Sequence, residues 1–357
     1  MRTGRLAKIR GFHSLQTVLA FALFLGINFC YGISYQKALE DSRALINEVS
    51  SADQVELEEV FSAERTGGGW TQGFTVTDKY YVVVTTVSDG DNFMTAYDKK
   101  TFEEVRSVRC DIGHGNDLTY NSNTNEIVAL GGSDNMIKFF DADTLEEMPV
   151  RQIMLGVDAM PASNANGIAY NADLDEYYIV SPKTGIRIWG GDFIPTNISY
   201  KIESPFNLYQ TLSYHKGSLF YGRGCHVNHG ICEHGDENDD NLDAIQGRYA
   251  PSSGAVIVYN VRTGRRESVF YIPPMNSQDR YYGEFEGVSI DEKNSIYFLY
   301  SSYSGDLPSI GDDNTFVVFK LSKDNKLVGN AKLKKILNRK SGENTIDSGI
   351  TPLRKRN

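Results

Sequence analysis

Polar, small and bulky apolar residues follow one another in the same order at five places along the chain. The pattern is a polar residue, a small one, a bulky apolar one, then Thr, Ala or Ser, and finally Tyr, Val or Ile. The five stretches are QGFTV from Gln72, NDLTY from Asn116, NGIAY from Asn166, QTLSY from Gln210 and EGVSI from Glu286. Each is followed by a turn, a second apolar run and a third run ending in an aromatic residue, as in MTAYDKKT and IKFFDADT. The pattern predicts one unit of strands repeated five times.

A sheet of four antiparallel strands with two apolar faces is not stable alone in water. Packing five such sheets around an axis buries those faces, so the sequence predicts an all-β fold, a five-bladed β-propeller over residues 64–337. A β-sandwich is the alternative, but it would not need the same polar residue at the start of every unit. The innermost strands must carry small residues, a requirement met by Gly73, Thr75, Thr119, Gly167, Ala169, Ser213, Gly287 and Ser289. Residues 55–61 are expected to close the ring as a strand borrowed from the other end of the chain.

Residues 1–33 resemble a targeting segment. Arg2, Arg5, Lys8 and Arg10 precede an unbroken apolar run over 17–33. That run is short for a membrane span and long for a cleaved signal, so a secretory signal peptide is favoured over an uncleaved anchor. In both cases the rest of the chain is expected to be exported, either secreted or held by a single N-terminal anchor. Residues 34–63 form a polar, partly helical lead-in.

Charge is unevenly spread along the chain. The net charge of −10 becomes about −20 for residues 17–330 once the +4 of the first residues and the +6 of the last are set aside. An acidic body argues against nucleic acid as a partner, because phosphate binding needs a basic face. Residues 338–357 are predicted to be a basic, disordered tail. The chain is expected to be a monomer, in contact with membrane only if the N-terminal segment stays uncleaved.

Unit four contains a hydrophilic insertion, 223–253, of a length that is usually functional or disordered. Its Cys225 and Cys232 are predicted to form a disulfide in an oxidising compartment. The spacing of these cysteines with His226, His229 and His234 does not match a structural zinc site. The following DENDDNLD is either a weak Ca²⁺ site or a solvated acidic loop, because it lacks the Gly and the final Glu of an EF-hand.

The first residues of the five stretches are expected to converge on the propeller axis at one face. They are Gln72, Asn116, Asn166, Gln210 and Glu286, with Trp70, His114, Asp117, Asn164 and Glu284 at the same mouth. Three roles are open for this ring. Its amides can bond to neighbouring blades and plug the channel; Glu286, Asn116 and Asn166 can hold Ca²⁺ through oxygen ligands; or the ring can contact a substrate directly.

For acid–base catalysis, Asp117 and Glu286 are the acids expected near one rim, with Glu284 beside them, and the candidate base is Asp117 or His114. The sequence has no GxSxG, no HExxH and no phosphate-binding glycine loop. Whether the protein is an enzyme is therefore left open at this point.

The string GHGNDLTYNSNTNEIVALGG, with ANGIAYN and EFEGVSID further on, resembles the exported propeller-like proteins grouped with the bacteriocin helveticin. That resemblance implies a secreted protein acting at cell surfaces, with no catalytic residues to transfer. A looser similarity is to gluconolactonase-type propellers, in which a Glu and Asn or Asp residues of the inner strands hold a divalent metal. It implies that role for Glu286, Asn116 and Asn166, although that family has six blades.

Two functions follow from these observations. The first is an exported binding propeller that recognises a cell-surface glycan, a wall component or a protein through its channel mouth and the unit-four insertion. The alternative is a metal-dependent, Ca²⁺-type hydrolase or lactonase acting at the central channel.

Overall fold

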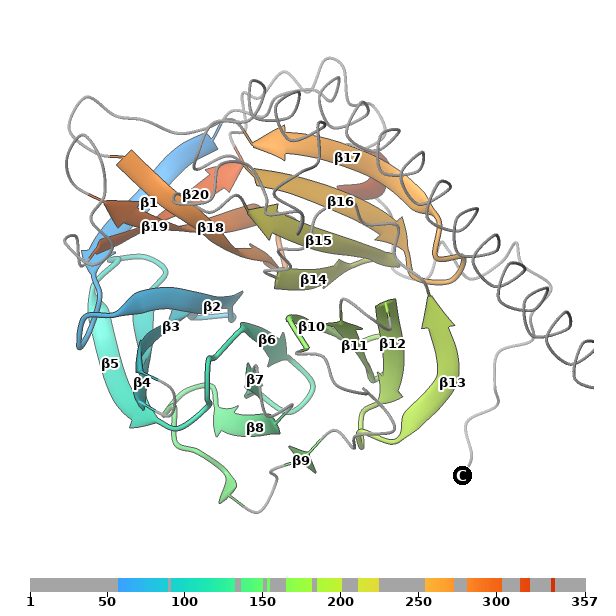
Figure 1. Cartoon of the computed structure of the whole chain (residues 1–357), viewed down its shortest axis with the longest axis horizontal. Helices are drawn as coiled ribbons and strands as arrows, with labels where there is room; N and C mark the ends of the chain where they lie inside the picture. The colour runs from blue at the N-terminus through green and yellow to red at the C-terminus, as the bar shows by residue number, and fades with distance from the viewer. Residues whose placement is uncertain are drawn as a thin grey trace, which may run out of the picture. The chain divides into compact units, whose positions relative to one another are not determined.

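The computed structural model describes residues 57–88, 91–131, 136–149, 153–154, 165–181, 185–200, 211–224, 254–272, 281–303, 315–321 and 335–337. All of them belong to the larger of two compact units, 49–202 with 206–357. The described strands form five antiparallel sheets of four strands each, arranged around a common centre (Figure 1). The predicted five-bladed β-propeller is confirmed.

Each blade runs from an inner to an outer strand. Blade one contains β2 (Trp70–Val76), β3 (Tyr80–Ser88), β4 (Asp91–Asp98) and β5 (Glu104–Cys110). Blade two contains β6 (Asp117–Asn121), β7 (Glu126–Gly131), β8 (Met136–Asp141) and β9 (Ile153–Met154). Blade three contains β10 (Gly167–Asn171), β11 (Glu176–Ser181), β12 (Gly185–Gly190) and β13 (Pro195–Tyr200). Blade four contains β14 (Thr211–His215), β15 (Ser218–Gly224), β16 (Gly254–Asn260) and β17 (Arg266–Ile272); blade five contains β18 (Tyr281–Ile290), β19 (Ile296–Tyr303), β20 (Thr315–Leu321) and β1 (Leu57–Glu64).

The middle strands of each blade are buried on both faces because neighbouring blades cover them. Every residue of β7, EIVALG, is buried, whereas β5 at the outer edge, EVRSVRC, is mostly exposed. The buried side chains group into clusters between blades; Val128, Phe139, Ile168 and Tyr177 belong to one that joins blades two and three. Burying bulky apolar residues between sheets is the dominant stabilisation of such a fold.

Blade five is completed by a strand from the opposite end of the described chain. β1 pairs antiparallel with β20, so the closure predicted for residues 55–61 is confirmed, and the ring includes residues ahead of 64. Phe61 of β1 is buried, and its ring lies 5.3 Å from those of Tyr81 and Tyr97 in blade one. The closing strand therefore also joins the last blade to the first.

Turns of one type follow the third strands of three blades. The Asp98 carboxylate accepts hydrogen bonds from the N–H groups of Lys100 and Thr101, and Asp141 and Asn260 do the same in their blades. Short polar side chains that bond their own backbone in this way favour turns over continued strand.

The signal or anchor segment, the lead-in up to residue 56, the tail and the disulfide pair Cys225–Cys232 lie outside the described residues. Within the described ranges no helix is long and apolar enough to cross a membrane. Cys110 is a buried free thiol, and burial raises its pKa to about 12.

Candidate functional site: the propeller axis

The inner strands β2, β6, β10, β14 and β18 line the centre of the ring (Figure 1). Side chains two positions apart on a strand point to the same side, so equivalent alternate residues stack as layers along the axis. We call Gly73, Asp117, Gly167, Thr211 and Gly287 the hub layer. We call Thr75, Thr119, Ala169, Ser213 and Ser289, each two residues further on, the hydroxyl layer.

In the hub layer one carboxylate joins several blades. Asp117 Oδ2 accepts hydrogen bonds from the backbone N–H of Ile168 and of Leu212, both at 2.9 Å. Its Oδ1 accepts a bond from the Thr211 hydroxyl at 3.1 Å, and the Thr211 oxygen in turn accepts the N–H of Val288 at 3.2 Å. Blade two is thus linked to blades three and four directly and to blade five through Thr211.

Asp117 is completely buried. Burial raises its pKa well above the ordinary value, and hydrogen bonds from the Ile168, Leu212 and Leu118 N–H groups and the Thr211 hydroxyl oppose that rise. An isolated buried carboxylate would be very unfavourable, so its bonds to four donors explain how it is accommodated.

The three glycines of the hub layer let the strands approach this carboxylate. A Cβ at Gly287 would lie 2.5 Å from Phe74 Cβ, and one at Gly167 would lie 2.9 Å from Leu212 Cβ. Both distances are too short for carbon atoms that cannot rotate away. Glycine is therefore required at these positions by close packing between blades.

The side chains at the predicted ring positions lie one residue before the hub layer. The Asn116 amide donates to Ala165 O at 2.9 Å in the connection to blade three, as expected if the amides bond to neighbouring blades. Glu286 is buried, and its Oε1 lies 3.4 Å from the Ser301 hydroxyl on β19. Gln72 and Asn166 are half-buried, and Gln210 lies outside the described residues.

The two candidate catalytic residues, Asp117 and His114, differ in burial. His114 is exposed and its carbonyl accepts a bond from the Thr86 hydroxyl, whereas Asp117 lies inside the axis. Trp70 is 44% exposed, and Asn164 and the Glu284 side chain are outside the described residues.

Among the described residues no group of three or more His, Cys, Asp or Glu side chains is placed to hold a metal ion. The predicted Ca²⁺ site has the ligands Glu286, Asn116 and Asn166. Two of these are amides, so the finding, which concerns His, Cys, Asp and Glu alone, does not test that site.

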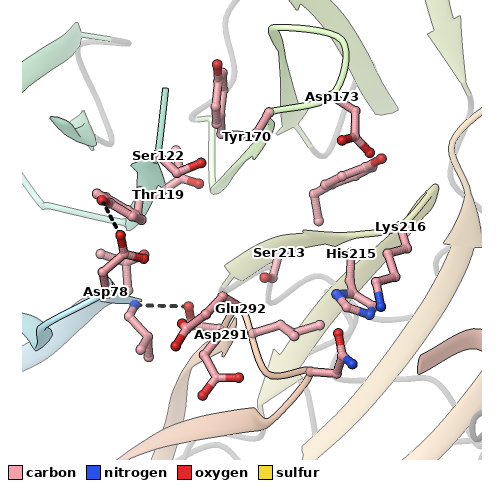
Figure 2. Close-up of a pocket in the computed structure, with 18 residues that line it drawn as sticks. Asp78, Thr119, Ser122, Tyr170, Asp173, Ser213, His215, Lys216, Asp291 and Glu292 are labelled. Atoms are coloured by element: carbon pink, nitrogen blue, oxygen red, sulfur yellow. Dashed lines mark hydrogen bonds between the residues drawn. The ribbon is translucent and has the colours of Figure 1, made fainter. Parts of the chain in front are cut away.

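A cavity of about 360 Å³ opens at the other end of the inner strands, where they finish. That volume is within the range of small-ligand sites. Residues of all five blades line it, and Figure 2 shows side chains from several of them around one space. Its lining consists of Thr75, Val76, Asp78, Thr119, Tyr120, Ser122, Tyr170, Ala172, Asp173, Ser213, Tyr214, His215, Lys216, Ser289, Ile290, Asp291, Glu292 and Asn294. We call this cavity the axial pocket.

The hydroxyl layer forms the floor of the axial pocket, and most of its hydroxyls have open bonding capacity. Thr75, Thr119 and Ser213 line the pocket and make no hydrogen bond through their side chains to any described residue. Thr75 is 3% exposed and Thr119 8% exposed, so the little surface they keep faces the cavity. Ser289 accepts the Val76 N–H at 3.0 Å and keeps its own proton to donate.

Three tyrosines form walls of the pocket, and their positions are fixed by neighbouring groups. The Tyr170 hydroxyl donates to Asp175 at 2.7 Å, and the Tyr120 hydroxyl donates to Asn125 at 3.0 Å. The Tyr214 ring stacks on Tyr178 with 5.8 Å between centroids. Aromatic faces held in place offer a ligand contact area at low entropic cost.

His215 occupies an unusual place in this wall. At the equivalent positions Thr77, Asn121, Asn171 and Asp291 accept backbone N–H groups of the following turn. His215 is followed by a tight Lys216–Gly217 turn instead, and its Nε2 lies 3.2 Å from Leu337 O. Burial lowers the pKa of His215 to about 4, so its imidazole is neutral at pH 7.

Sequence reasoning placed the candidate site at the beginning of the inner strands and missed the pocket at their ends. The signal was present: the fourth residue of each repeated stretch is Thr, Thr, Ala, Ser and Ser in turn. A hydroxyl at four of five equivalent positions exceeds what small size alone requires, because alanine or glycine would satisfy packing equally.

No family model matches this chain, and no curated protein matches it. Neither search supports the helveticin or gluconolactonase name. Among solved structures, glutaminyl cyclase from Myxococcus xanthus is similar over 75% of this chain and 97% of its own, with a TM-score of 0.46 and 10% identity. A protein of unknown function from Bacteroides thetaiotaomicron VPI-5482 is similar over 78% of this chain and 66% of its own, with a TM-score of 0.42 and 10% identity. Similarities this distant carry no conclusion about activity.

Proposed function

We propose that this protein is an exported binding propeller that holds a unit of an extracellular glycan in its axial pocket. The observation that carries the proposal is the open hydroxyl layer. Thr75, Thr119 and Ser213 present donors and acceptors that no described residue uses, at the floor of a cavity of about 360 Å³. Buried polar groups are normally hydrogen-bonded, so such a floor suits a ligand that supplies the missing partners.

A sugar fits this description better than an apolar ligand. Sugar hydroxyls both donate and accept, as Thr and Ser hydroxyls do, so each contact can be satisfied in either direction. The faces of Tyr120, Tyr170 and Tyr214 offer flat walls against which the C–H side of a pyranose ring can pack. The pocket volume limits the enclosed part to one or two sugar units.

The proposal is tested by glycan-array screening of the purified protein, followed by calorimetric titration of the best ligand. Thr119→Val keeps the shape of the side chain and removes its hydroxyl, and it is expected to weaken binding by about tenfold. Thr101→Val, in the exposed turn after β4, is the matched control and should leave affinity unchanged. Absence of any glycan ligand, or equal loss in both variants, would contradict the proposal.

The Ca²⁺-dependent hydrolase stays a second hypothesis, tested separately at the other end of the axis. If Glu286, Asn116 and Asn166 hold Ca²⁺, added calcium should raise the melting temperature by mass action, and Glu286→Gln should abolish that rise. An unchanged melting temperature with calcium or with EDTA would remove this hypothesis without affecting the axial pocket.

A further inference from the structure

From the charges around the axial pocket we infer that the bound sugar carries a free ammonium group, as an amino sugar does. This inference rests on the proposed function and narrows its ligand. Figure 2 shows Asp78, Asp173, Asp291 and Glu292 around the same space as Thr119 and Ser213, on strand ends and turns of different blades. Acids from separate blades converge here although nothing in the local sequence pairs them.

The positive groups of the pocket do not balance these acids. Lys216 is the one Lys or Arg among the lining residues, and His215 is neutral at pH 7. Lys99 and Lys293, both outside the lining, lie 3.5 Å and 4.0 Å from Glu292 and neutralise that side chain in part. The charge of Lys79, also outside the lining, acts on Asp78. The lining itself still holds four acids against Lys216, so the pocket keeps a negative potential that attracts a cation.

Asp173 is the acid most available to a ligand. Its side chain is exposed, lines the pocket and makes no hydrogen bond or ion pair with any described residue. By contrast, Asp291 Oδ1 accepts the N–H groups of Lys293 and Ser295, and its Oδ2 accepts the Tyr297 hydroxyl. Burial raises the pKa of the pocket residue Tyr214 to about 12, and the charge of Asp173 adds to that rise.

An ammonium suits this lining better than a metal ion or a guanidinium. It has three donors in a compact head, which can be shared between hydroxyl oxygens and a carboxylate. Thr75, Thr119 and Ser213 offer such hydroxyl acceptors, and Asp173 adds the charge. The electron-rich faces of the pocket tyrosines favour a cation further. No described cluster of three acidic or histidine side chains would hold a metal here.

Three oligosaccharide series with the same β-1,4 backbone test this inference, because they differ only at carbon 2 of each sugar. Chitosan oligomers carry an ammonium there, chitin oligomers an acetamide and cello-oligomers a hydroxyl. The titrations are run at about pH 5.5, where the amine of the chitosan oligomers is protonated. We expect chitosan oligomers to bind about tenfold more tightly than cello-oligomers, and the difference to shrink as salt is added.

Asp173→Asn removes the charge and keeps the shape, and it should reduce chitosan affinity by about threefold with no loss for cello-oligomers. Glu103→Gln, an exposed acid in the turn before β5 and outside the lining, is the matched control and should change neither. Equal binding of the chitosan and cello series would overturn the ammonium inference while the glycan-binding proposal stands. Failure of every glycan on the array would overturn both.

Discussion

The hub layer and the hydroxyl layer take their residues from the same five inner strands, two positions apart. In the hub layer one carboxylate and one threonine fill the axis, and their polar atoms bond to neighbouring strands. In the hydroxyl layer Thr75, Thr119 and Ser213 bond to no described residue. The first layer therefore consumes its hydrogen-bonding capacity in holding blades together, and the second keeps that capacity for a ligand.

The comparison shows that a polar residue on a propeller axis can have one of two roles: holding the blades together or remaining open to a ligand. Asp117 looks like a catalytic acid from its residue type, yet it is completely buried and surrounded by donors. Thr119 looks like a small filler, yet it lies at the floor of an open cavity. Residue type does not distinguish these two roles, but the hydrogen bonds that each side chain makes do.

The largest expected effect comes from Asp117→Ala. It would leave the N–H groups of Ile168 and Leu212 and the Thr211 hydroxyl without their acceptor, at a cost of about 3–5 kcal/mol in the free energy of unfolding. Urea denaturation measures this cost. Asp98→Ala is the control, because that carboxylate also accepts two backbone N–H groups but lies in a solvent-accessible turn, so its loss should cost much less. Similar losses for the two variants would show that Asp117 does not act as a hub.

The next largest effect is the pH dependence of stability that His215 contributes in the wall of the axial pocket. The pKa of His215 falls from 6.5 to about 4 on folding, so between these values the unfolded chain binds the extra proton. Stability is therefore undiminished above pH 6.5 and falls as the pH drops toward 4, by about 3 kcal/mol in total from this group. His215→Gln should remove that part of the pH dependence. Denaturation curves for both proteins across this range provide the measurement, and parallel curves would contradict the shift.

The fold could be predicted from the sequence because it is written five times. Each unit repeats its apolar runs and turn residues, and the Asp98, Asp141 and Asn260 turns recur at equivalent places. The closing strand was visible as apolar–polar alternation in VELEEVF. A strand pattern that is weak in one unit is supported by the same pattern in the other four. Both the order of the strands and the number of blades could therefore be predicted.

The site was predictable only in part, because alternation does not say which residues face the axis. β6, DLTYN, is buried on both faces except for the half-buried Tyr120, so the stretch that begins with Asn116 offers no apolar–polar contrast to show whether Asn116 or Asp117 faces the axis. A shift of one residue moves a side chain to the other face of a strand. The axial pocket also forms only where the strand ends and turns of five blades come together in space. No short stretch of the sequence predicts that arrangement.

The smallest expected effect gives the sharpest test of the contrast between the hub layer and the hydroxyl layer. The same substitution, threonine to valine, can be made in each layer. Thr211→Val in the hub layer removes the hydroxyl that bonds to Asp117 and to the Val288 N–H, so it should cost about 2 kcal/mol of stability. Thr119→Val in the hydroxyl layer removes a hydroxyl with no partner among the described residues, so stability should change by no more than about 0.5 kcal/mol.

Both variants keep the shape of threonine on equivalent inner strands, so their difference reports hydrogen bonding and not packing. Thermal or urea unfolding of the pair measures it without any ligand. A loss at Thr119 equal to that at Thr211 would mean that the Thr119 hydroxyl already serves the fold. In that case the open floor of the axial pocket, and the glycan site proposed on it, would lose their basis.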